Sequence, residues 1–403
     1  MGETVTISRR RFLGTTAAAA TVLGAPAIAR GQEPIVIGTL MPLSGGGGVY
    51  GGDMQRAVTL GAEIINGAGG VLGRQIKLFH EDGQTNPDGA VRGARKLIDV
   101  NRVVAILGTW SSAVTLAVGP ICVQNKVVLM NCSGSEKVTD LGKTGYAYRT
   151  QASNVLWGAA FGRLAAERGF KRAAVLGQQN PFALTMKEYF EKAFEQRGGK
   201  LVETVMYNPE QSTYRSELTR AFASKPEVVL IAGYTPDASI LVKDWFRAGY
   251  GGQLMLPGFA VNPKFISNVG AEAAQGILVV EAAPAPESKA FQQFKKVMGK
   301  EDLFLYSSQT YDQLALVCLA MQASGEATGD GIRKSMRKIA NPPGTQVSSA
   351  VEGIAAVKAG QDIDYDGASG SCDFDDNGDL LTKSFYVFQV RAGKLEQIGL
   401  MKA

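Results

Sequence analysis

Two short segments rich in serine and glycine are the part of this sequence best suited to bind a small molecule. Residues 108–112 read Gly-Thr-Trp-Ser-Ser, and residues 131–135 read Asn-Cys-Ser-Gly-Ser. Both offer hydroxyl groups and backbone N–H groups, and the first leads into a helical pattern, whose N-terminus would carry a partial positive charge. Such donors suit a carboxylate. Each segment could instead be a plain helix cap or turn, but two neighbouring segments of the same chemistry favour a shared anion site.

The pattern of strands and helices would bring these two segments together. Short apolar runs of strand length alternate with stretches in which apolar residues lie three and four apart. This alternation predicts an α/β fold with parallel sheets covered by helices on both faces. Open sheets of this kind bind ligands at the carboxyl ends of neighbouring strands, where both segments fall. The predicted strands are residues 35–41, 76–80, 103–107, 127–130, 173–176, 202–207, 228–232, 254–256 and 277–280.

The strand series breaks near residues 149–150, which predicts two doubly wound parallel-sheet lobes. An Ala/Pro stretch at 282–286 indicates a second crossing between the lobes, and a long helical pattern at 306–323 follows it. Near the C-terminus, strand-like runs at 372–374 and 384–390 flank an Asp-Asn-Gly-Asp turn and predict a hairpin. We expect lobe 1 to comprise residues 30–150 and 283–370, and lobe 2 to comprise residues 151–282 and 371–403.

The first 29 residues have the pattern of an export signal. Arginines within the run Ser-Arg-Arg-Arg-Phe-Leu-Gly at 8–14 precede a weakly apolar stretch that is shorter than the roughly 20 residues needed to span a bilayer. Ala27 and Ala29 match the A-x-A spacing of a cleavage site, which would leave Arg30 as the new N-terminus. The order resembles a twin-arginine signal and predicts export to the periplasm. The absence of a cysteine at the junction argues against a lipid anchor.

The charge balance and the cysteine and histidine content exclude several classes of protein. The chain has 42 basic and 37 acidic residues, and loss of the leader would reduce the net charge from +5 to +3. That balance, without a basic cluster interleaved with aromatic residues, argues against nucleic-acid binding. Four scattered cysteines do not make a disulfide scaffold; Cys318 and Cys372 could pair, or all could be buried thiols. With one histidine, a zinc site has almost nothing to be built from, and we expect no cofactor, no metal and no membrane insertion.

Other motifs are weaker. Four glycines at 45–48 lack the lysine and spacing of a phosphate-binding loop, and we interpret them as a flexible loop at the cleft edge that positions Tyr50. Residues 373–378 fit the opening of a calcium loop, but Ser384 stands where a bidentate glutamate should be, so an ordinary turn is favoured. The only histidine, His80, lies in a different segment from the serines. A secreted α/β hydrolase is therefore the least favoured function, and we expect no enzyme.

The motifs resemble, in order, those of the type I periplasmic solute-binding proteins of branched-chain amino-acid ABC transporters, the family of leucine/isoleucine/valine-binding proteins. The resemblance implies two lobes joined by a multi-strand hinge, which close over an amino acid or related small carboxylate and deliver it to a membrane permease. A sensing subunit that uses the same cleft is an alternative to transport. The matching elements are IGTLMPLSG at 37–45, GGVLGR at 69–74, Asp82 with Asn86 and Pro87, residues 108–112, Gly233-Tyr234, Tyr311-Asp312, and FD at 374–375 with GDL at 378–380.

The resemblance also assigns ligand contacts position by position. The carboxylate-binding serine falls on Ser112, and the loop residues that hold the ligand's carboxylate and amine fall on Ser133 and Ser135. Aromatic residues that line the cleft map to three tyrosines, and the tyrosine of the second lobe maps near Pro181-Phe182. The expected ligand-binding residues are Tyr50, Trp110, Ser111, Ser112, Ser133, Ser135, Phe182, Tyr234, Gly258, Tyr306 and Asp312.

One position departs from the family. The acidic residue that pairs with the ligand ammonium maps to Gly258. Because a buried ammonium without a counter-charge would cost several kcal/mol, either another acid substitutes or the ligand has no α-ammonium. Asp312 and Asp237 are the nearest substitutes, whereas an aromatic or aliphatic acid or amide would need none. The sequence therefore favours small-carboxylate binding over amino-acid binding.

Overall fold

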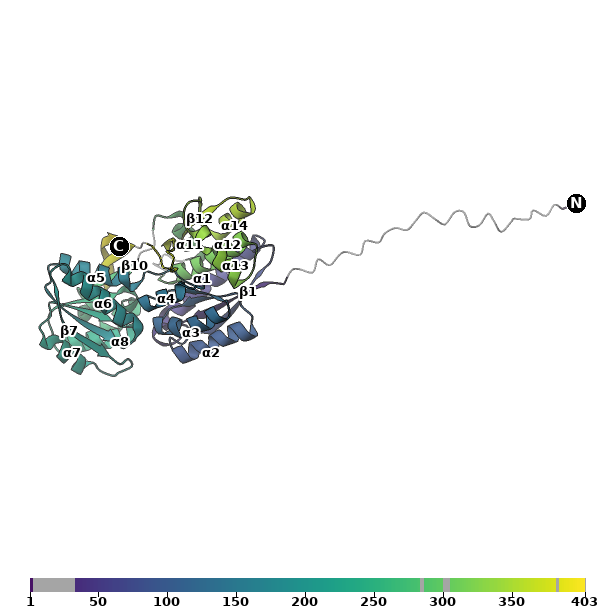
Figure 1. Ribbon diagram of the computed structural model, residues 1–403. Coiled ribbons are helices and arrows are strands. Elements are labelled where there is room, and N and C mark those ends of the chain that lie inside the picture. Colours follow the sequence, from purple (N-terminus) through teal and green to yellow (C-terminus); the bar gives the residue numbers. More distant parts are fainter. Residues whose placement is uncertain (3–32, 283–285, 300–304, 382–383, 403) are drawn as a thin grey trace. The chain divides into compact units, whose positions relative to one another are not determined.

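The computed structural model describes residues 1–2, 33–282, 286–299, 305–381 and 384–402 (Figure 1). Residues 1–33 and residues 34–403 form separate units, and the second unit contains all the secondary structure described below. The predicted export signal lies outside the described residues, apart from its first two. Within the described part of the chain, no helix is both long enough and apolar enough to cross a membrane.

The first sheet has five parallel strands in the order β2-β1-β3-β4-β5. Its side chains alternate between two cores, as the pleat requires. Ile37 of β1 and Leu107 of β3 face the core formed with α1 and the later helix α12 (Ser307–Ser324), whereas Leu40 and Ile106 face α2 and α3. The elements are β1 (Ile35–Met41), α1 (Gly48–Gly67), β2 (Ile76–Asp82), α2 (Pro87–Arg95), β3 (Ala105–Thr109), α3 (Ser112–Gln124), β4 (Val128–Asn131), α4 (Thr139–Gly142) and β5 (Ala147–Arg149).

The second sheet has seven strands in the order β15-β14-β10-β9-β8-β6-β7. Five are parallel, and β14 runs antiparallel to β10 and β15. The predicted class, α/β with parallel sheets, is confirmed. The elements are α5 (Asn154–Glu167), β6 (Arg172–Gln178), α6 (Pro181–Glu195), β7 (Lys200–Tyr207), α7 (Arg215–Ala223), β8 (Val228–Ala232), α8 (Thr235–Arg247), β9 (Gln253–Pro257), α9 (Pro263–Val269), α10 (Ala271–Ala274), β10 (Leu278–Ala282), β14 (Ser384–Arg391) and β15 (Lys394–Lys402).

A later part of the chain returns to the first sheet. In α12, the side chain of Gln313 accepts a hydrogen bond from the Gly108 N–H at 2.8 Å, and that of Gln322 accepts one from the Leu72 N–H at 2.9 Å. The first bond holds the long helix against β3, which leads into the first serine-containing segment, and the second holds it against the connection between α1 and β2. The elements of this region are α11 (Lys289–Met298), α12 (Ser307–Ser324), α13 (Gly329–Ala340), β11 (Thr345–Val347), α14 (Ala350–Lys358), β12 (Ile363–Gly367) and β13 (Gly370–Ser371).

The hairpin predicted from residues 372–374 and 384–390 is wrong. The Asp-Asn-Gly-Asp turn is local, because Asp375 accepts hydrogen bonds from the N–H groups of Asn377 and Asp379. The true hairpin joins β14 to β15 through Ala392 and Gly393, which both have positive φ angles, as a tight two-residue turn between strands requires.

Residues 371–381 instead pack beside the first sheet. The Arg149 N–H donates to the carbonyl oxygen of Gly378 at 2.9 Å, and the guanidinium of the same residue pairs with Asp379 at 2.6 Å. On the other side, Asn341 at the end of α13 donates to the Phe374 carbonyl oxygen at 2.8 Å. These contacts favour assigning residues 371–381 to the same lobe as β5.

All four cysteines are buried and none of them forms a disulfide, so the alternative with a Cys318–Cys372 disulfide is wrong. Burial raises the pKa of the Cys122 thiol to about 12. A thiol of this kind stays protonated and behaves as a small apolar side chain.

Candidate functional site

The two serine-containing segments meet at the carboxyl edge of the first sheet. Thr109, at the end of β3, is the register partner of Asn131, at the end of β4. The Ser135 N–H donates to Ser112 Oγ at 3.1 Å, which joins the two segments directly. Because a hydroxyl that accepts a bond keeps its own proton, Ser112 can still donate to a ligand. Ser112 is also the first residue of α3, where backbone N–H groups favour an anion.

The other predicted serines differ in what they can offer. Ser133 Oγ lies 2.6 Å from Thr115 Oγ1 and donates to the Trp110 carbonyl oxygen at 3.3 Å, so it holds the two segments together. Ser135 Oγ is buried and has no hydrogen-bond partner among the described residues. Such an unpaired hydroxyl is costly unless a ligand or water satisfies it. Ser112 and Ser135 are therefore two hydroxyls whose protons no described group of the protein is shown to accept.

Arg149, which the sequence did not single out, fixes the second segment from behind. Its side chain is almost fully buried and donates to the carbonyl oxygens of Ser133 at 3.1 Å and Ser135 at 2.8 Å. The ion pair with Asp379 compensates the buried charge. An arginine at the end of a short apolar strand was the only sequence signal for this role.

Aromatic side chains from both sheets meet over these serines, and we call them the aromatic cluster. Trp110 lies with its ring centroid 4.9 Å from that of Tyr234, at the start of α8, and 5.6 Å from that of Phe259. Tyr50 of α1 lies 5.4 Å from Tyr306 between ring centroids. The members are Tyr50, Trp110, Trp157, Phe182, Tyr234, Phe259 and Tyr306. The sequence had pointed to five of these seven residues but not to Trp157 or Phe259.

Two hydrogen bonds also link the sheets through this cluster. Tyr50 donates its hydroxyl proton to the carbonyl oxygen of Phe259, and Tyr234 donates to Ser111 Oγ at 3.3 Å. Burial raises the pKa of both tyrosines, so both remain neutral donors throughout the physiological pH range. A neutral donor can approach a carboxylate without charge repulsion.

The glycine-rich loop makes room for this cluster. A Cβ atom at Gly47 would lie 2.6 Å from Trp110 Cε3, and one at Gly46 would lie 2.8 Å from Tyr234 Cδ2. Both distances are too short for carbon atoms in contact. The loop therefore allows aromatic side chains from the two sheets to approach the same stretch of backbone, and it leads into α1, which carries Tyr50.

Little space is left inside the aromatic cluster. The cavity there has a volume of about 10 Å³ and is bordered by Ser112, Gly134 and cluster residues. This is the space of about one water molecule, since a water needs roughly 10–15 Å³ by this measure. An organic ligand could enter only if the side chains or the two sheets moved apart.

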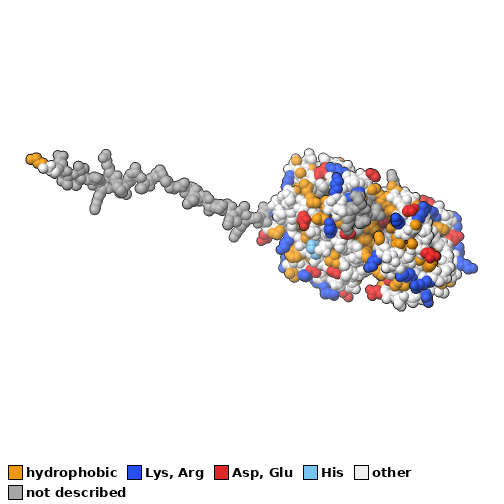
Figure 2. All heavy atoms as spheres, turned by 180° about the vertical axis from the view of Figure 1, so that it is seen from behind, with side chains coloured by type: hydrophobic (Ala, Val, Ile, Leu, Met, Phe, Trp, Pro, Cys, Tyr) orange, Lys and Arg blue, Asp and Glu red, His pale blue; other side chains and the backbone are white. Residues whose placement is uncertain are grey.

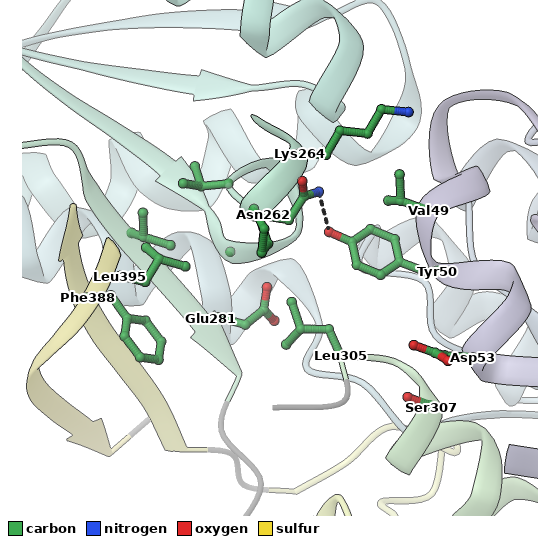
Figure 3. A pocket seen from close by; sticks show the side chains of 14 residues that line it. Val49, Tyr50, Asp53, Asn262, Lys264, Glu281, Leu305, Ser307, Phe388 and Leu395 are labelled. Carbon is green, nitrogen blue, oxygen red and sulfur yellow. Dashed lines mark hydrogen bonds between the residues drawn. The ribbon is translucent and has the colours of Figure 1, made fainter. Parts of the chain in front are cut away.

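A larger cavity of about 400 Å³ lies next to the cluster and is shown in Figure 3. Small-molecule sites have volumes of roughly 300–1,000 Å³, so this cavity has ligand size. Tyr50 borders it and Asn262, whose side-chain amide donates to the Tyr50 hydroxyl at 3.2 Å, forms part of the opposite wall. The lining residues are Val49, Tyr50, Asp53, Gly258, Val261, Asn262, Pro263, Lys264, Val279, Glu281, Leu305, Ser307, Phe388 and Leu395.

Glu281 brings an acidic group to the position where the sequence suggested that one was missing. A Cβ atom at Gly258 would lie 2.5 Å from Glu281 Cβ and 2.7 Å from Glu281 Oε2. Because Pro257 on β9 is the register partner of Val280 on β10, Glu281 is the next neighbour across the sheet. Matching positions along the sequence does not show which residues are neighbours across a sheet, so the sequence analysis missed Glu281. The available signal was an acidic residue within the apolar strand Leu-Val-Val-Glu-Ala.

The two acids named as the nearest substitutes, Asp312 and Asp237, accept hydrogen bonds from groups of the protein itself. Asp312 is buried and accepts hydrogen bonds from the Tyr365 hydroxyl at 2.9 Å and from the N–H groups of Ala368 and Ser369 at 2.8 and 2.7 Å. Asp312 lies on the side of α12 that is turned toward β12, so it contacts the loop that follows β12. It lines neither cavity. Asp237 likewise accepts a bond from the Tyr214 hydroxyl at 2.7 Å.

Two comparisons by sequence define the relatives of this chain. The family model described as "Periplasmic binding protein" matches residues 34–394. The leucine-, isoleucine-, valine-, threonine-, and alanine-binding protein of Pseudomonas aeruginosa is 24% identical over 92% of this chain and 94% of its own length. A chemotactic signal transduction system substrate-binding protein of Halobacterium salinarum is 23% identical over 85% of this chain and 83% of its own length.

Solved structures share the fold. A leucine-binding protein from Thermotoga maritima superposes with a TM-score of 0.78, at 23% identity, over 91% of this chain and 98% of that chain. A solute-binding protein of an ABC transporter from R. palustris, in complex with benzoate, gives a TM-score of 0.75 at 21% identity over 91% and 96%. At these identities the likeness concerns the fold alone.

Proposed function

Because the chain belongs to the periplasmic binding protein family, we propose that it is the substrate-binding protein of an ABC transporter and binds an amino acid or related small carboxylate between two closing lobes. The first lobe comprises residues 30–150 and 283–381, and the second comprises residues 151–282 and 384–403. Compared with the sequence-based boundaries, residues 371–381 move to the first lobe because of their contacts with Arg149.

One observation carries the proposal: two adjacent loops present Ser112 and Ser135 beside the N-terminus of α3, beneath an aromatic cluster built from both lobes. The serine hydroxyls and the N–H groups of the helix hold the carboxylate. The aromatic residues cover the apolar part of the ligand and exclude water, which strengthens those hydrogen bonds.

Binding requires the lobes to separate and close. The cavity of about 10 Å³ in the aromatic cluster cannot admit an organic acid without movement. Opening breaks the contacts of Tyr50 with Phe259 and of Tyr234 with Ser111, and closure over the ligand restores contacts between the lobes. Hinge closure of this kind couples ligand binding to a change of surface that a membrane permease recognises.

A receptor for aromatic acids is the second candidate for the ligand class. The aromatic cluster favours it, because rings that pack edge to face, such as Trp110 and Phe259, can pack in the same way against the ring of an aromatic acid once the lobes have opened. A benzoate complex exists for one of the structures of the same fold. Sensing is an alternative to transport, since one relative belongs to a chemotactic system.

A hydrolase gains no support from the hydrogen bonds of the described residues. His80 Nδ1 lies 2.8 Å from Thr39 Oγ1, and the hydroxyls of Ser112 and Ser133 contact backbone groups or another hydroxyl.

The twin-arginine leader and export to the periplasm belong to the proposal. Replacing Arg9, Arg10 and Arg11 with lysine should retain the precursor in the cytoplasm, as cell fractionation would report.

A thermal-shift screen of residues 30–403 tests the proposal. The panel contains amino acids, benzoates, short aliphatic acids, amides and dicarboxylates. A ligand that binds only the folded state, present at 100 times its Kd, stabilises the protein by about 2.7 kcal/mol and raises Tm. We expect at least one monocarboxylate to do so; a result in which only the amides of the panel, and none of its carboxylates, raise Tm would contradict a carboxylate receptor.

A further inference from the structure

We infer that the 400 Å³ cavity beside the aromatic cluster binds a positively charged nitrogen of the ligand and that Glu281 is the acid that pairs with it. The inference rests on the proposed function, because it treats this cavity as a second part of the same ligand site. It selects ammonium-bearing carboxylates over the acids without an amine that the sequence favoured.

Glu281 is positioned as a fixed charge at the wall of this cavity. Its side chain is 2% exposed, Oε2 accepts a hydrogen bond from the Phe259 N–H at 3.0 Å, and Oε1 accepts one from the Ala282 N–H at 2.9 Å. These bonds hold the carboxylate in one orientation. Its charge also contributes, after burial, to the raised pKa values of Tyr50 and Tyr306, so it acts on the residues that separate the two cavities.

Ser307 provides an independent observation that points to a ligand. Its hydroxyl is 1% exposed and has no hydrogen-bond partner among the described residues, and the residue lines the cavity. A buried hydroxyl without a partner costs free energy unless something in the cavity satisfies it. A hydroxyl oxygen can accept a proton from an ammonium group.

The remaining charges of the cavity also favour a cation. Figure 3 shows Glu281, from β10, on one side, and Asp53, from α1, together with Ser307 on the other, with Leu305 between them. The single lysine of the lining, Lys264, is exposed and extends away from Glu281. Glu281 and Asp53 therefore both lie where a ligand cation in the cavity could contact their carboxylates.

The apolar wall defines the rest of the ligand group. Val279, Phe388 and Leu395, from strands of the second sheet, line the cavity beside Glu281. A ligand with its nitrogen at Glu281 would therefore place an aliphatic or aromatic group against these three side chains. Gly258 is required in this arrangement because any side chain there would collide with the carboxylate that binds the nitrogen.

Matched ligand pairs test the inference. Calorimetry compares L-leucine with 4-methylpentanoate and L-phenylalanine with 3-phenylpropanoate, which differ only in the amine. The protein is residues 30–403 as wild type, Glu281→Gln, Asp53→Asn and Glu272→Gln, the last being an exposed acid of the second lobe outside the cavity. The circular dichroism spectrum and Tm verify that each variant is folded.

We expect the wild type to prefer the amino acid in at least one pair by tenfold or more. Glu281→Gln should remove that preference while leaving the affinity for the deaminated acid within about threefold, since a charged partner contributes roughly 1.5–3 kcal/mol. Asp53→Asn, which leaves the interior of the second sheet intact, should reduce the preference less, and Glu272→Gln should leave it unchanged.

Two results would overturn the inference in different ways. If the deaminated acids bind as tightly as the amino acids, or if Glu281→Gln weakens both members of a pair equally, Glu281 does not select an ammonium, and the carboxylate function stands. If no member of either pair binds, the inference and the amino-acid form of the proposed function fail together. If Glu281→Gln does not fold, Asp53→Asn provides the test: an unchanged preference for the amino acid in that variant would show that the cavity does not bind the ammonium.

Discussion

Glu281 fills the space into which a side chain at position 258 would project, and this steric relation determines how the ligand chemistry is interpreted. Taken alone, Gly258 suggests a receptor without an acid for the ammonium. Across the sheet, the neighbouring strand provides the acid from the next position. Residue-by-residue comparison along a chain cannot detect such an exchange, because the two residues are far apart in sequence and adjacent only after β9 and β10 pair.

Gly258→Ala should lower the free energy of unfolding by about 1–3 kcal/mol, because the added methyl group would overlap the Glu281 side chain between two packed strands. Urea denaturation measures the change. Gly52→Ala is the matched control: this glycine lies on the exposed side of α1 with open space around it, and the change should be neutral or stabilising by up to about 1 kcal/mol. Equal effects at the two positions would exclude a steric role for Gly258.

Ser112→Ala should weaken the binding of the best carboxylate by about 1–3 kcal/mol, because the charged acceptor loses a hydroxyl donor. Isothermal titration calorimetry measures the change, with Ser216→Ala on the exposed face of α7 as the control. The position of Ser112 at the carboxyl end of the sheet was predictable from local patterns alone. A dissociation constant that stays the same in Ser112→Ala would remove this serine from the site.

At the scale of elements, alternating apolar patterns predicted the parallel strands and the two serine-containing loops, because both signals are local. The C-terminal region was mispredicted because its pairing is long-range. The Asp-Asn-Gly-Asp turn looks like a hairpin turn, but its residues are held by Arg149 from a strand 230 positions earlier. Likewise, the face of α12 on which Asp312 lies depends on the packing of β12, which the helical period does not reveal.

Asp312→Ala should destabilise the protein by about 3 kcal/mol without changing ligand affinity. The substitution leaves the buried N–H groups of Ala368 and Ser369 and the hydroxyl of Tyr365 without their acceptor. Chemical denaturation and calorimetry on the folded variant separate the two effects. A variant with unchanged stability and much weaker binding would return Asp312 to the ligand site.

Glu136 should make stability depend on pH in a defined direction. Burial, followed by repulsion from Glu188 of α6, raises the pKa of Glu136 above its ordinary value of 4.5, although the positive charges of Arg149 and Lys192 oppose the shift. The folded protein therefore binds this proton more tightly than the unfolded chain, so the stability from this group is present below pH 4.5 and is lost as pH rises through the higher, folded-state pKa.

Glu136→Gln mimics the neutral acid and should remove that loss. The free energy of unfolding of Glu136→Gln, relative to that of the wild type, should be higher at pH 7.5 than at pH 4.5. Urea titrations of both proteins at the two pH values measure this difference. A difference between the proteins that does not change with pH would show that burial of Glu136 imposes no proton linkage.

At the scale of the whole molecule, the resemblance carried by ordered sequence motifs is confirmed by the family match over residues 34–394. On the face shown in Figure 2, basic and acidic side chains are interspersed, in keeping with the nearly equal numbers of basic and acidic residues in the sequence. The closed aromatic cluster could not be predicted, because it depends on how two independently folded sheets meet. Its members come from α1, α5 and α6, from the residues directly before α8 and α12, and from the loops after β3 and β9.

The central claim is that the ligand enters this cluster between the two sheets, and the emission of Trp110 tests it most directly. Trp110 contacts Tyr234 and Phe259 across the lobes, so admission of a ligand must change its surroundings. A stabilising carboxylate should shift the tryptophan emission saturably, with the Kd found by calorimetry. The shift should persist in Trp245→Phe, shrink in Trp110→Phe and vanish when Trp110 and Trp157, the two tryptophans of the cluster, are both replaced by phenylalanine. A carboxylate that raises Tm and binds stoichiometrically, yet gives the same emission change in the double variant as in the wild type, would contradict the account.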